Sequence, residues 1–551
     1  MSTFDFKKET PHAFPKLDEE QIAAVAEFAK CKTYHDGDVL FRGGETDFMF
    51  HVIKSGAIEI IDRSAGEPQT ILVHEPGEFT GDIANLAGRT SNVDAVAKGE
   101  TEVYEVCEAD LRQIISERPN LSDLILQTFI TRTQALNETE HFTGLRVIGS
   151  RFSPDTFRIR DFLSKNHVLY TYFDIDTDRE VGALLKSLDL KESDTPVVGY
   201  GYDWFLHNPS NEELAERIGI KQELSRTEIY DLAIVGGGPA GLAAAVYSAS
   251  EGLKTIVLEQ IAAGGQAATS SKIENYLGFP TGLSGTELAE RATIQAEKFG
   301  AQLSIPSKVA GLVFDDNLSI LHLENGEQVK AKAVIVATGA DYRKLEVEGR
   351  ERFDGAGVYY AATAMESQTC GGEQIIVVGG GNSAGQAAIF LSENARKVLL
   401  LIRNSDLSET MSSYLIERIE QTENIEVLPN TEISAMFGEK YLEAVELKNN
   451  KTSDLRKIRV SGVFSFIGTI PRTSWLPSEI EIDERGFIKT GSMVSSSEQW
   501  TLERQPFFLE SSHPGIFAAG DVRSGSVKRV ASAVGEGAMA LQFVHEYLSI
   551  I

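Results

Sequence analysis

A glycine-rich turn near the middle of the chain is the clearest sign of chemistry in this sequence. The apolar run 231–235 is followed by Gly-Gly-Gly-Pro-Ala-Gly at 236–241 and by an alanine-rich stretch through 250. This order predicts a buried strand, a tight turn and a helix whose free N-terminal amides and dipole favour a pyrophosphate. The first glycine permits the bend, the second lets the backbone approach the phosphates, and the third allows helix and strand to pack closely. The residues expected at this first dinucleotide site are Gly236, Gly238, Pro239, Ala240 and Gly241.

An acidic residue ends the strand that is predicted after this helix. The strand covers 255–258 and leads into Glu259 and Gln260. An acid about 20 residues beyond the glycines is expected to meet the ribose hydroxyls of a bound dinucleotide. Glu259 therefore completes the first dinucleotide site.

The same pattern occurs a second time. A strand is predicted at 374–378, followed by Gly-Gly-Gly-Asn-Ser-Ala at 379–384. The strand after the next helix, 397–402, ends at an arginine rather than at an acid. Arginine favours the 2′-phosphate of NADPH through its charge and bidentate geometry, although NADH stays open. The residues expected to bind the nicotinamide dinucleotide are Gly379, Gly381, Asn382, Ser383, Ala384 and Arg403.

The composition excludes several classes of function. Lys and Arg number 52 against 81 Asp and Glu, and the resulting formal charge of −29 repels nucleic acid. No apolar run approaches the ~20 residues that span a bilayer, and nothing at the start resembles a leader, so we expect no membrane partner and a cytoplasmic protein. The 3 cysteines lie far apart, which predicts neither a disulfide framework nor a metal site.

The hydrophobic patterns divide the chain into several domains. Residues 1–140 alternate apolar and polar positions between glycine turns, as in an all-β roll, and end with helical spacing. Residues 144–222 alternate between strand and helix, as in a small α/β domain. The two strand–turn–helix units lie beyond residue 228.

From 228 to its end the chain resembles the low-molecular-weight thioredoxin reductases. Four further motifs match in order, namely Gly-Gly-Gln at 264–266 with Glu-Asn-Tyr at 274–276, Val-Ala-Thr-Gly at 336–339, Gly-Ile-Phe-Ala-Ala-Gly-Asp at 515–521, and Lys-Arg-Val-Ala at 528–531. The resemblance implies a homodimer and an FAD domain in two parts, 228–345 and 463–551, around an NAD(P)H domain at 346–462. The further FAD contacts that it implies are Gly265, Gln266, Asn275, Val309, Thr338, Gly339, Gly520, Asp521, Arg529, Val530 and Ala531.

The cysteine pair of this family is missing. In these reductases the nicotinamide domain opens with Cys-Ala-Thr-Cys, which takes electrons from the flavin, whereas the matching positions here are Ala361 and Ala364. Cys370 has no second cysteine nearby, and one thiol alone does not complete a dithiol–disulfide cycle. We therefore expect it to be a packed, inert thiol. The arginines that bind the 2′-phosphate in this family are also fewer here, since Arg403 is followed by Asn404 and Ser408 at the matching positions.

The middle domain resembles the glutaredoxins. A strand at 145–148 leads into the turn 153–156, and Thr-Pro-Val at 195–197 resembles the cis-proline segment of that family, which implies a cis peptide before Pro196. The turn has Ser-Pro-Asp-Thr in place of Cys-Pro-x-Cys. We expect a thioredoxin-like fold that has lost its redox function, with an ordinary α/β spacer as the alternative.

The N-terminal module resembles cyclic nucleotide-binding β-rolls, at 36–56 and at 77–91. That family holds the ribose hydroxyl with Glu and the cyclic phosphate with Arg, and here Asp82 and Ser91 take these places. A neutral hydroxyl does not give the bidentate, charge-assisted contact of arginine, and Arg89 replaces it only if the loop re-aims this side chain. A sensor with an altered ligand and a roll kept for packing or dimer contacts both stay open.

These features predict a multidomain chain with an N-terminal all-β roll with helices, a small α/β thioredoxin-like domain and two α/β Rossmann-like domains. The expected function is an FAD oxidoreductase that passes a hydride from NAD(P)H to the flavin and electrons on to an unidentified external acceptor. Two alternatives are a thioredoxin-disulfide reductase that works through the thiols of a partner, and a redox or nucleotide sensor that does not turn over.

Overall fold

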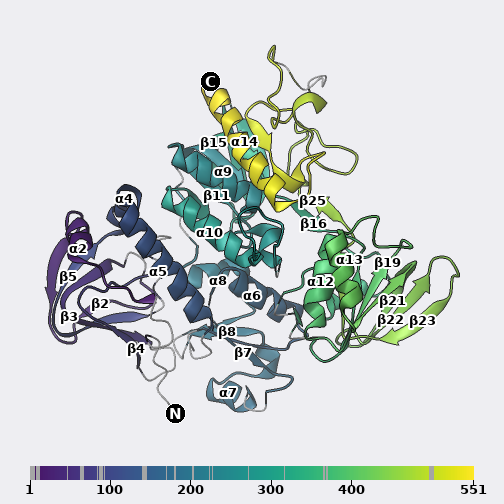
Figure 1. Ribbon diagram of the computed structural model, residues 1–551, viewed down its shortest axis with the longest axis horizontal. Helices are drawn as coiled ribbons and strands as arrows, with labels where there is room; N and C mark the ends of the chain where they lie inside the picture. The colour runs from purple at the N-terminus through teal and green to yellow at the C-terminus, as the bar shows by residue number, and fades with distance from the viewer. Residues whose placement is uncertain are drawn as a thin grey trace.

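The computed structural model describes the chain except residues 1–6, 8–12, 46–47, 63–67, 83–84, 86–90, 92, 139–144, 169, 179–180, 201–203, 222–223, 226, 271, 316, 364–365, 368–369, 495–499 and 501, and the side chains of 133–138 and 187. Figure 1 shows the β-roll at one side and the predicted FAD domain, called the flavin domain below, at the top. The predicted NAD(P)H domain, called the nicotinamide domain below, lies at the other side, and a small α/β domain lies below and between them.

The N-terminal β-roll has the strand order β1-β5-β3-β4, with β2 paired to β5. Two long antiparallel strands, β3 and β5, form its centre, and Phe50–Val52 pairs with Tyr104–Val106. Buried positions alternate with more exposed ones further along both strands. Its elements are α2 (Glu19–Ala26), β1 (Lys30–Tyr34), β2 (Val39–Phe41), β3 (Phe50–Asp62), β4 (Gln69–His74), β5 (Asp94–Val106), α4 (Glu108–Glu117) and α5 (Pro119–Glu138).

The small domain has the strand order β7-β6-β8-β9, in which β6 is parallel to β7 and antiparallel to β8. The peptide between Thr195 and Pro196 is cis, as the glutaredoxin resemblance implies. Its elements are β6 (Leu145–Gly149), α6 (Pro154–Lys165), β7 (Tyr170–Asp174), α7 (Val181–Ser187), η2 (Glu192–Asp194), β8 (Val197–Tyr200), β9 (Trp204–His207) and α8 (Asn211–Arg217).

The flavin domain is built on a sheet with the order β12-β11-β10-β15-β14-β13. The strand β26 comes from near the C-terminus and pairs in parallel with β15, so this sheet is assembled from two parts of the chain. Its elements are β10 (Ile229–Val235), α9 (Pro239–Ser250), β11 (Thr255–Leu258), η3 (Gly265–Thr269), α10 (Gly285–Lys298), β12 (Gln302–Ser304), β13 (Val309–Asp315), β14 (Leu318–Leu323), β15 (Gln328–Val336), β26 (Ile516–Ala518), η6 (Gly520–Val522) and α14 (Val530–Leu548).

The nicotinamide domain has a parallel sheet, β17-β24-β18-β19-β20, and an antiparallel sheet, β21-β22-β23. We expected this domain to end at 462, but β24 pairs with both β17 and β18, so the sheet extends to 465. Its elements are η4 (Arg350–Phe353), β17 (Val358–Tyr359), β18 (Gln374–Val378), α12 (Asn382–Ser392), β19 (Lys397–Ile402), α13 (Ser413–Gln421), β20 (Ile425–Pro429), β21 (Thr431–Phe437), β22 (Ala444–Asn449), β23 (Leu455–Arg459) and β24 (Gly462–Ser465).

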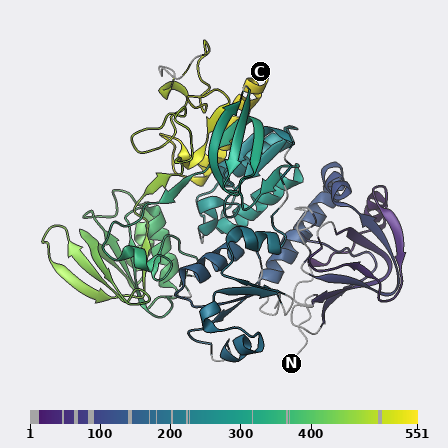
Figure 2. The same cartoon turned by 180° about the vertical axis from the view of Figure 1, so that it is seen from behind.

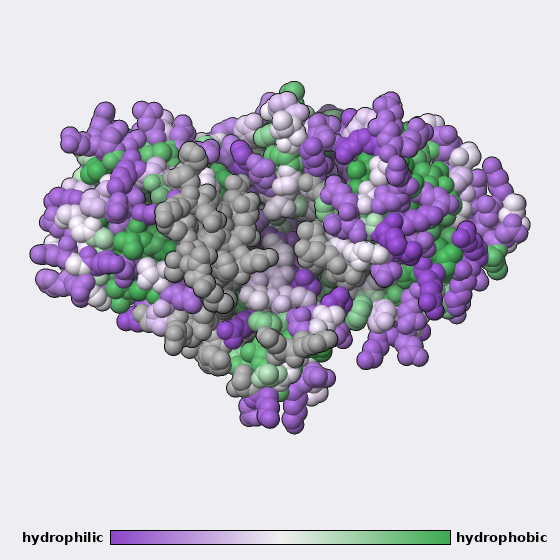
Figure 3. Space-filling model, turned by 60° about the horizontal axis from the view of Figure 1, so that its bottom comes forward, coloured by the Kyte–Doolittle hydropathy of each residue, from purple (hydrophilic) through white to green (hydrophobic). Residues whose placement is uncertain are grey.

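Two short antiparallel strands, β16 (Ala340–Tyr342) and β25 (Thr469–Pro471), carry the chain between these two domains. Figure 2 shows from behind the same crossing between the flavin domain and the nicotinamide domain. Hydrophilic side chains cover most of the described surface on the face in Figure 3. Among the described residues, no helix combines the length and apolar content needed to cross a membrane.

Candidate functional site

The first glycine-rich turn joins β10 to α9. An ideal Cβ on Gly236 would lie 2.4 Å from the Ala337 carbonyl oxygen, and one on Gly241 would lie 1.9 Å from the Gly236 carbonyl oxygen. The fold itself therefore requires glycine at both positions. Gly238 differs, because the nearest atom to its ideal Cβ is the Gly265 Cα at 4.0 Å. No side chain caps α9 at Gly238, so the first amides of this helix are left for a ligand.

Glu259 lies buried beside this turn. Its carboxylate accepts hydrogen bonds from the Gly237 amide at 2.7 Å and from the Ile261 amide at 3.0 Å. These two bonds fix the orientation of the carboxylate at the end of β11, where the sequence predicted an acid for the ribose hydroxyls.

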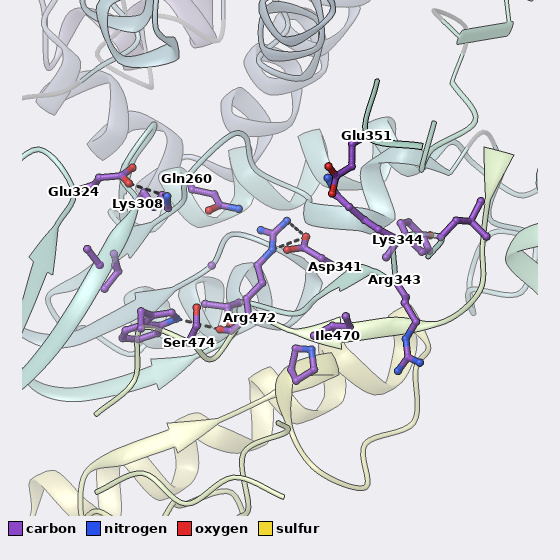
Figure 4. A pocket seen from close by; sticks show the side chains of 18 of the residues that line it. Gln260, Lys308, Glu324, Asp341, Arg343, Lys344, Glu351, Ile470, Arg472 and Ser474 are labelled. Carbon is purple, nitrogen blue, oxygen red and sulfur yellow. Dashed lines mark hydrogen bonds and ion pairs between the residues drawn. The ribbon is translucent and has the colours of Figure 1, made fainter. Parts of the chain in front are cut away.

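A cleft of about 1580 Å³ opens beside the turn and brings five of the predicted residues together, namely Gly236, Glu259, Gln260, Val309 and Thr338. Figure 4 shows the Arg472–Asp341 and Lys308–Glu324 ion pairs that line it. The cleft lies between β11, β13 and the crossing strands.

The loop before η3 packs directly against the first turn. The Gly264 amide donates to the Gly237 carbonyl at 2.7 Å, and an ideal Cβ on Gly265 would lie 3.0 Å from the Gly238 Cα. The structure thus places Gly238 and Gly265 face to face. Because both residues are glycines, no side chain separates the two backbone segments.

The rest of this loop is tied to the crossing and to the nicotinamide domain. The Gln266 side-chain amide donates to the Ala340 carbonyl in β16. Asn275 lies exposed further along the chain, and its neighbour Glu274 pairs with Arg418 of α13 at 3.0 Å. Gln266 therefore lies with the other predicted residues, whereas Asn275 lies at the surface.

Asp521 follows β26, and burial raises the pKa of its carboxyl group. The Lys528 ammonium donates to the Asp521 carbonyl oxygen. The helix α14 begins directly afterwards with Arg529 as its N-cap and without a side-chain cap, so the amides of Val530 and Ala531 are available to a ligand.

Tyr342 joins the two predicted dinucleotide sites. This residue of β16 lines the cleft beside the first turn, and its ring meets the ring of Phe466 edge-on at 5.4 Å and 89°. The Phe466 carbonyl borders Gly379 of the second turn. Sequence reasoning missed Tyr342. Its only signal was its place shortly after Thr338 and Gly339, where the chain leaves the flavin domain.

The second glycine-rich turn repeats the geometry of the first. An ideal Cβ on Gly379 would lie 2.4 Å from the Phe466 carbonyl oxygen, whereas one on Gly381 would meet no atom within 4 Å. The Asn382 side chain accepts from the Ser412 amide at 2.8 Å and donates to the Ser412 hydroxyl at 3.0 Å. No side chain caps α12 at Gly381, so its first amides are also left for a ligand.

Arg403 is exposed at the end of β19, next to this turn in sheet order. The next residue, Asn404, donates to Glu409 at 2.7 Å and carries no charge. Arg403 is thus exposed at the strand end where the sequence predicts a 2′-phosphate contact, and its neighbourhood is less basic than the family pattern.

The position of the relay carries no sulfur. Ala361 follows β17, and Ala364 lies outside the described residues. Cys370 is only 2% exposed, and burial raises the pKa of its thiol to about 12. A thiol that is buried and protonated at neutral pH is a poor nucleophile.

In the β-roll, Ser91, which stands at the predicted phosphate-binding position, is hydrogen-bonded to the backbone of Val93. The buried Ser91 hydroxyl donates to the Val93 carbonyl at 2.8 Å and accepts from the Val93 amide at 3.2 Å. Arg89 lies outside the described residues, and Asp82 follows Gly81 within the segment 77–91, which is called the cassette below.

A buried arginine that sequence reasoning missed holds this cassette. Arg132 of α5 donates to the carbonyl oxygens of Ala13 at 2.8 Å, Phe79 at 3.0 Å and Gly81 at 2.6 Å. Its guanidinium group is thereby committed to the backbone of the roll.

The described residues fit two dinucleotides. Uncapped amides at the start of α9, α12 and α14, and open space at Gly238 and Gly381, are what two pyrophosphates and a flavin require. Tyr342, which lines the cleft and contacts Phe466, lies between the two turns.

Comparison with known proteins agrees with this geometry. A family model described as pyridine nucleotide-disulphide oxidoreductase matches residues 230–537, and one described as cyclic nucleotide-binding domain matches residues 31–118. Thioredoxin reductase from Treponema pallidum is 36% identical over 323 residues, which cover 58% of this chain and 98% of the relative. Thioredoxin reductase from Bacillus subtilis is 32% identical over 326 residues, which cover 59% of this chain and 96% of the relative.

A solved structure agrees as well. The crystal structure of T. acidophilum thioredoxin reductase is 30% identical with a TM-score of 0.53 and covers 59% of this chain and 100% of its own. The resemblances to thioredoxin reductases and to cyclic nucleotide-binding domains are thus confirmed. The thioredoxin reductase family uses FAD and NADPH. The chain belongs to the pyridine nucleotide-disulphide oxidoreductase family, as an NAD(P)H-dependent FAD oxidoreductase similar to the thioredoxin reductases.

Proposed function

We propose that this enzyme passes electrons from NADPH through its flavin directly to an external acceptor, without a thiol relay of its own. The observation that carries the proposal is the relay position, where Ala361 stands in place of a cysteine and the nearest cysteine in sequence, Cys370, is buried with a thiol pKa of about 12. A bound flavin would supply the redox chemistry, namely uptake of a hydride from the nicotinamide and transfer of two electrons to the acceptor.

The protein's part is binding and orientation. In this proposal the amides after Gly238 and Gly381 bind the two pyrophosphates, Glu259 binds the ribose next to the adenine, and Asp521 with the start of α14 holds the flavin end. Tyr342 sits between the two sites. Its ring contact with Phe466 orders the second turn relative to β16.

Steady-state turnover tests the proposal. Under anaerobic NADPH, ferredoxins, flavodoxins, quinones and disulfide proteins are offered as acceptors, and we expect sustained turnover with an acceptor that carries no disulfide. Flavin reduction that stops after one equivalent with every acceptor would favour a sensor. Rapid turnover with disulfide proteins alone would favour a reductase acting through the thiols of its partner.

Replacing Arg403 with alanine is expected to narrow the preference for NADPH over NADH. The lost contact is exposed, so we expect a cost of about 1 kcal/mol, or roughly fivefold in kcat/KM for NADPH, with little change for NADH. Arg396→Ala is the matched control, because Arg396 is an exposed arginine just before the opposite end of β19. An unchanged cofactor ratio in Arg403→Ala would make this residue an ordinary surface charge.

We also propose that the N-terminal module is a regulatory domain with an altered ligand. Cyclic AMP is expected to bind weakly or not at all, because Ser91 is uncharged and its hydroxyl is engaged with Val93. Calorimetry on the full chain should give a dissociation constant weaker than ~1 μM, which corresponds to about −8.2 kcal/mol. Submicromolar binding would show that another group, Arg89 first among them, holds the phosphate.

A further inference from the structure

The small thioredoxin-like domain contributes a side chain to the core of its neighbour. Three apolar residues of α6, namely Ile159, Phe162 and Leu163, lie in the core of the small domain itself. Phe157 instead packs against the core of the nicotinamide domain, with its ring 5.8 Å from that of Tyr359. The N-terminal end of α6 is therefore an interdomain surface.

The residues around the turn 153–156 make two more contacts with the nicotinamide domain. The ring of Phe152 stacks on that of Tyr441, in the β21–β22 hairpin, at 4.1 Å and 19°. An ideal Cβ on Gly355 would lie 3.5 Å from the Cα of Pro154. The turn that matches the cysteine pair of glutaredoxins is thus docked on the nicotinamide domain by residues on both of its sides.

This docking surface adjoins the position of the missing relay. Tyr359, which Phe157 touches, lies two residues before Ala361 in the chain, and Ala362 and Cys370 belong to the same apolar cluster as Phe157. A mixed disulfide brings two sulfur atoms to about 2 Å, so a dithiol protein must place its own turn here to exchange with a sulfur at position 361.

The docked turn has no exchange chemistry of its own. The Ser153 hydroxyl caps α6 by accepting a hydrogen bond from the Thr156 amide at 3.3 Å, and the side chain of Thr156 is buried, with the residue 1% exposed. Neither residue carries sulfur, so the contact is one of packing.

The other side of the small domain is anchored to the flavin domain. The buried Asn166 side chain donates to the Ile261 carbonyl at 2.9 Å, and Ile261 packs against the core of the small domain. Figure 1 shows α6 below the flavin domain and beside the nicotinamide domain. Two separate anchors therefore hold the turn in place.

We propose that the thioredoxin-like domain is a permanent internal occupant of the nicotinamide-domain face beside Ala361, and that it keeps thioredoxin-fold dithiol proteins away from this face. The inference rests on the proposed function and sharpens it, because it excludes one class of acceptor at this surface. Its test measures thiol accessibility and no flavin chemistry, so the two proposals fail independently.

The test uses the full-length holoenzyme with Ala361→Cys in a Cys31→Ser/Cys107→Ser background, which leaves the buried Cys370. The small probe is Ellman's reagent. The protein probe is a thioredoxin with a single turn cysteine that carries thionitrobenzoate in a mixed disulfide. The introduced thiolate attacks this disulfide, the new S–S bond joins the two proteins, and thionitrobenzoate leaves as a coloured thiolate.

The contact is opened with Phe157→Asp/Tyr441→Asp, and Tyr247→Asp is the control, because Tyr441 and Tyr247 are 37% and 47% exposed. We expect the opened variant to raise the ratio of the protein-probe rate to the small-probe rate by roughly tenfold or more, and the control to leave it unchanged. Tyr441→Asp alone alters only a surface hairpin, and should raise the ratio part of the way even if the double variant does not fold.

An equal ratio in the parent and in a folded opened variant would overturn the proposal, because the face would then be open already. Failure of Ellman's reagent to react in the parent would also overturn it, since position 361 would then not lie at an exchange surface.

Discussion

Valine in place of Gly238 is expected to give a folded protein that no longer retains FAD. The backbone at Gly238 has φ −75° and ψ −175°, which valine adopts readily, and no protein atom lies closer than 4.0 Å to the ideal Cβ. The new Cβ therefore has room, and the γ-methyl groups enter the space between this turn, Gly265 and the ligand. Loss of several hydrogen bonds to a charged pyrophosphate, each worth about 1.5–3 kcal/mol, should weaken FAD binding by at least roughly 100-fold.

The second turn supplies a matched control for this prediction. Gly381 has φ −94° and ψ 179°, and its ideal Cβ also meets no protein atom within 4 Å. Gly381→Val should therefore remain yellow and be reduced by dithionite, but lose reduction by NADPH. The FAD-to-protein absorbance ratio and far-ultraviolet circular dichroism measure the outcome. Full flavin occupancy in Gly238→Val, or FAD loss in Gly381→Val, would reverse the assignment of the two sites.

The second large effect concerns sulfur. Replacing Cys31, Cys107 and Cys370 with serine is expected to leave the rate of flavin reduction by NADPH within about twofold of the parent, because hydride transfer requires only that the two rings stack. Reduction of a thioredoxin should be absent or very slow in both proteins, since no resolving thiol is present at positions 361 and 364. Stopped-flow flavin absorbance and a coupled thioredoxin assay measure the two steps.

Cys370 is the decisive position in this experiment. Its burial makes serine costly there, about 1–3 kcal/mol of stability, because the acceptor of the thiol, the Ser461 carbonyl, lies 4.0 Å from the sulfur and too far for a good hydroxyl hydrogen bond. Cys370→Ala is therefore the companion variant that keeps the site apolar. Rapid thioredoxin reduction by the parent that stops in Cys370→Ala, with flavin reduction intact, would make Cys370 the relay. The claim of direct transfer would then be wrong.

The sequence by itself determined the local elements and the chemistry at their ends. The helix predicted to run from the first turn through 250 is Pro239–Ser250, and the strands predicted at 255–258 and 397–402 have those bounds. Glycines, small residues and apolar periodicity act within a few residues of one another, so their effect is readable in one segment. The absence of sulfur at position 361 is likewise a fact of the sequence, and it carries the proposed function.

Only the tertiary structure decided which distant segments meet. Tyr342 of β16 contacts Phe466 beside the second turn, Phe157 packs against the core of a neighbouring domain, and Arg132 binds carbonyl oxygens far from it in the chain. The bounds of the nicotinamide domain also depended on pairing, because β24 is a short apolar strand whose sheet is fixed by β17 and β18. These contacts join residues with no local pattern in common. They form because helices and strands bury their remaining apolar surface against one another, and which surfaces meet depends on the packing of the whole fold.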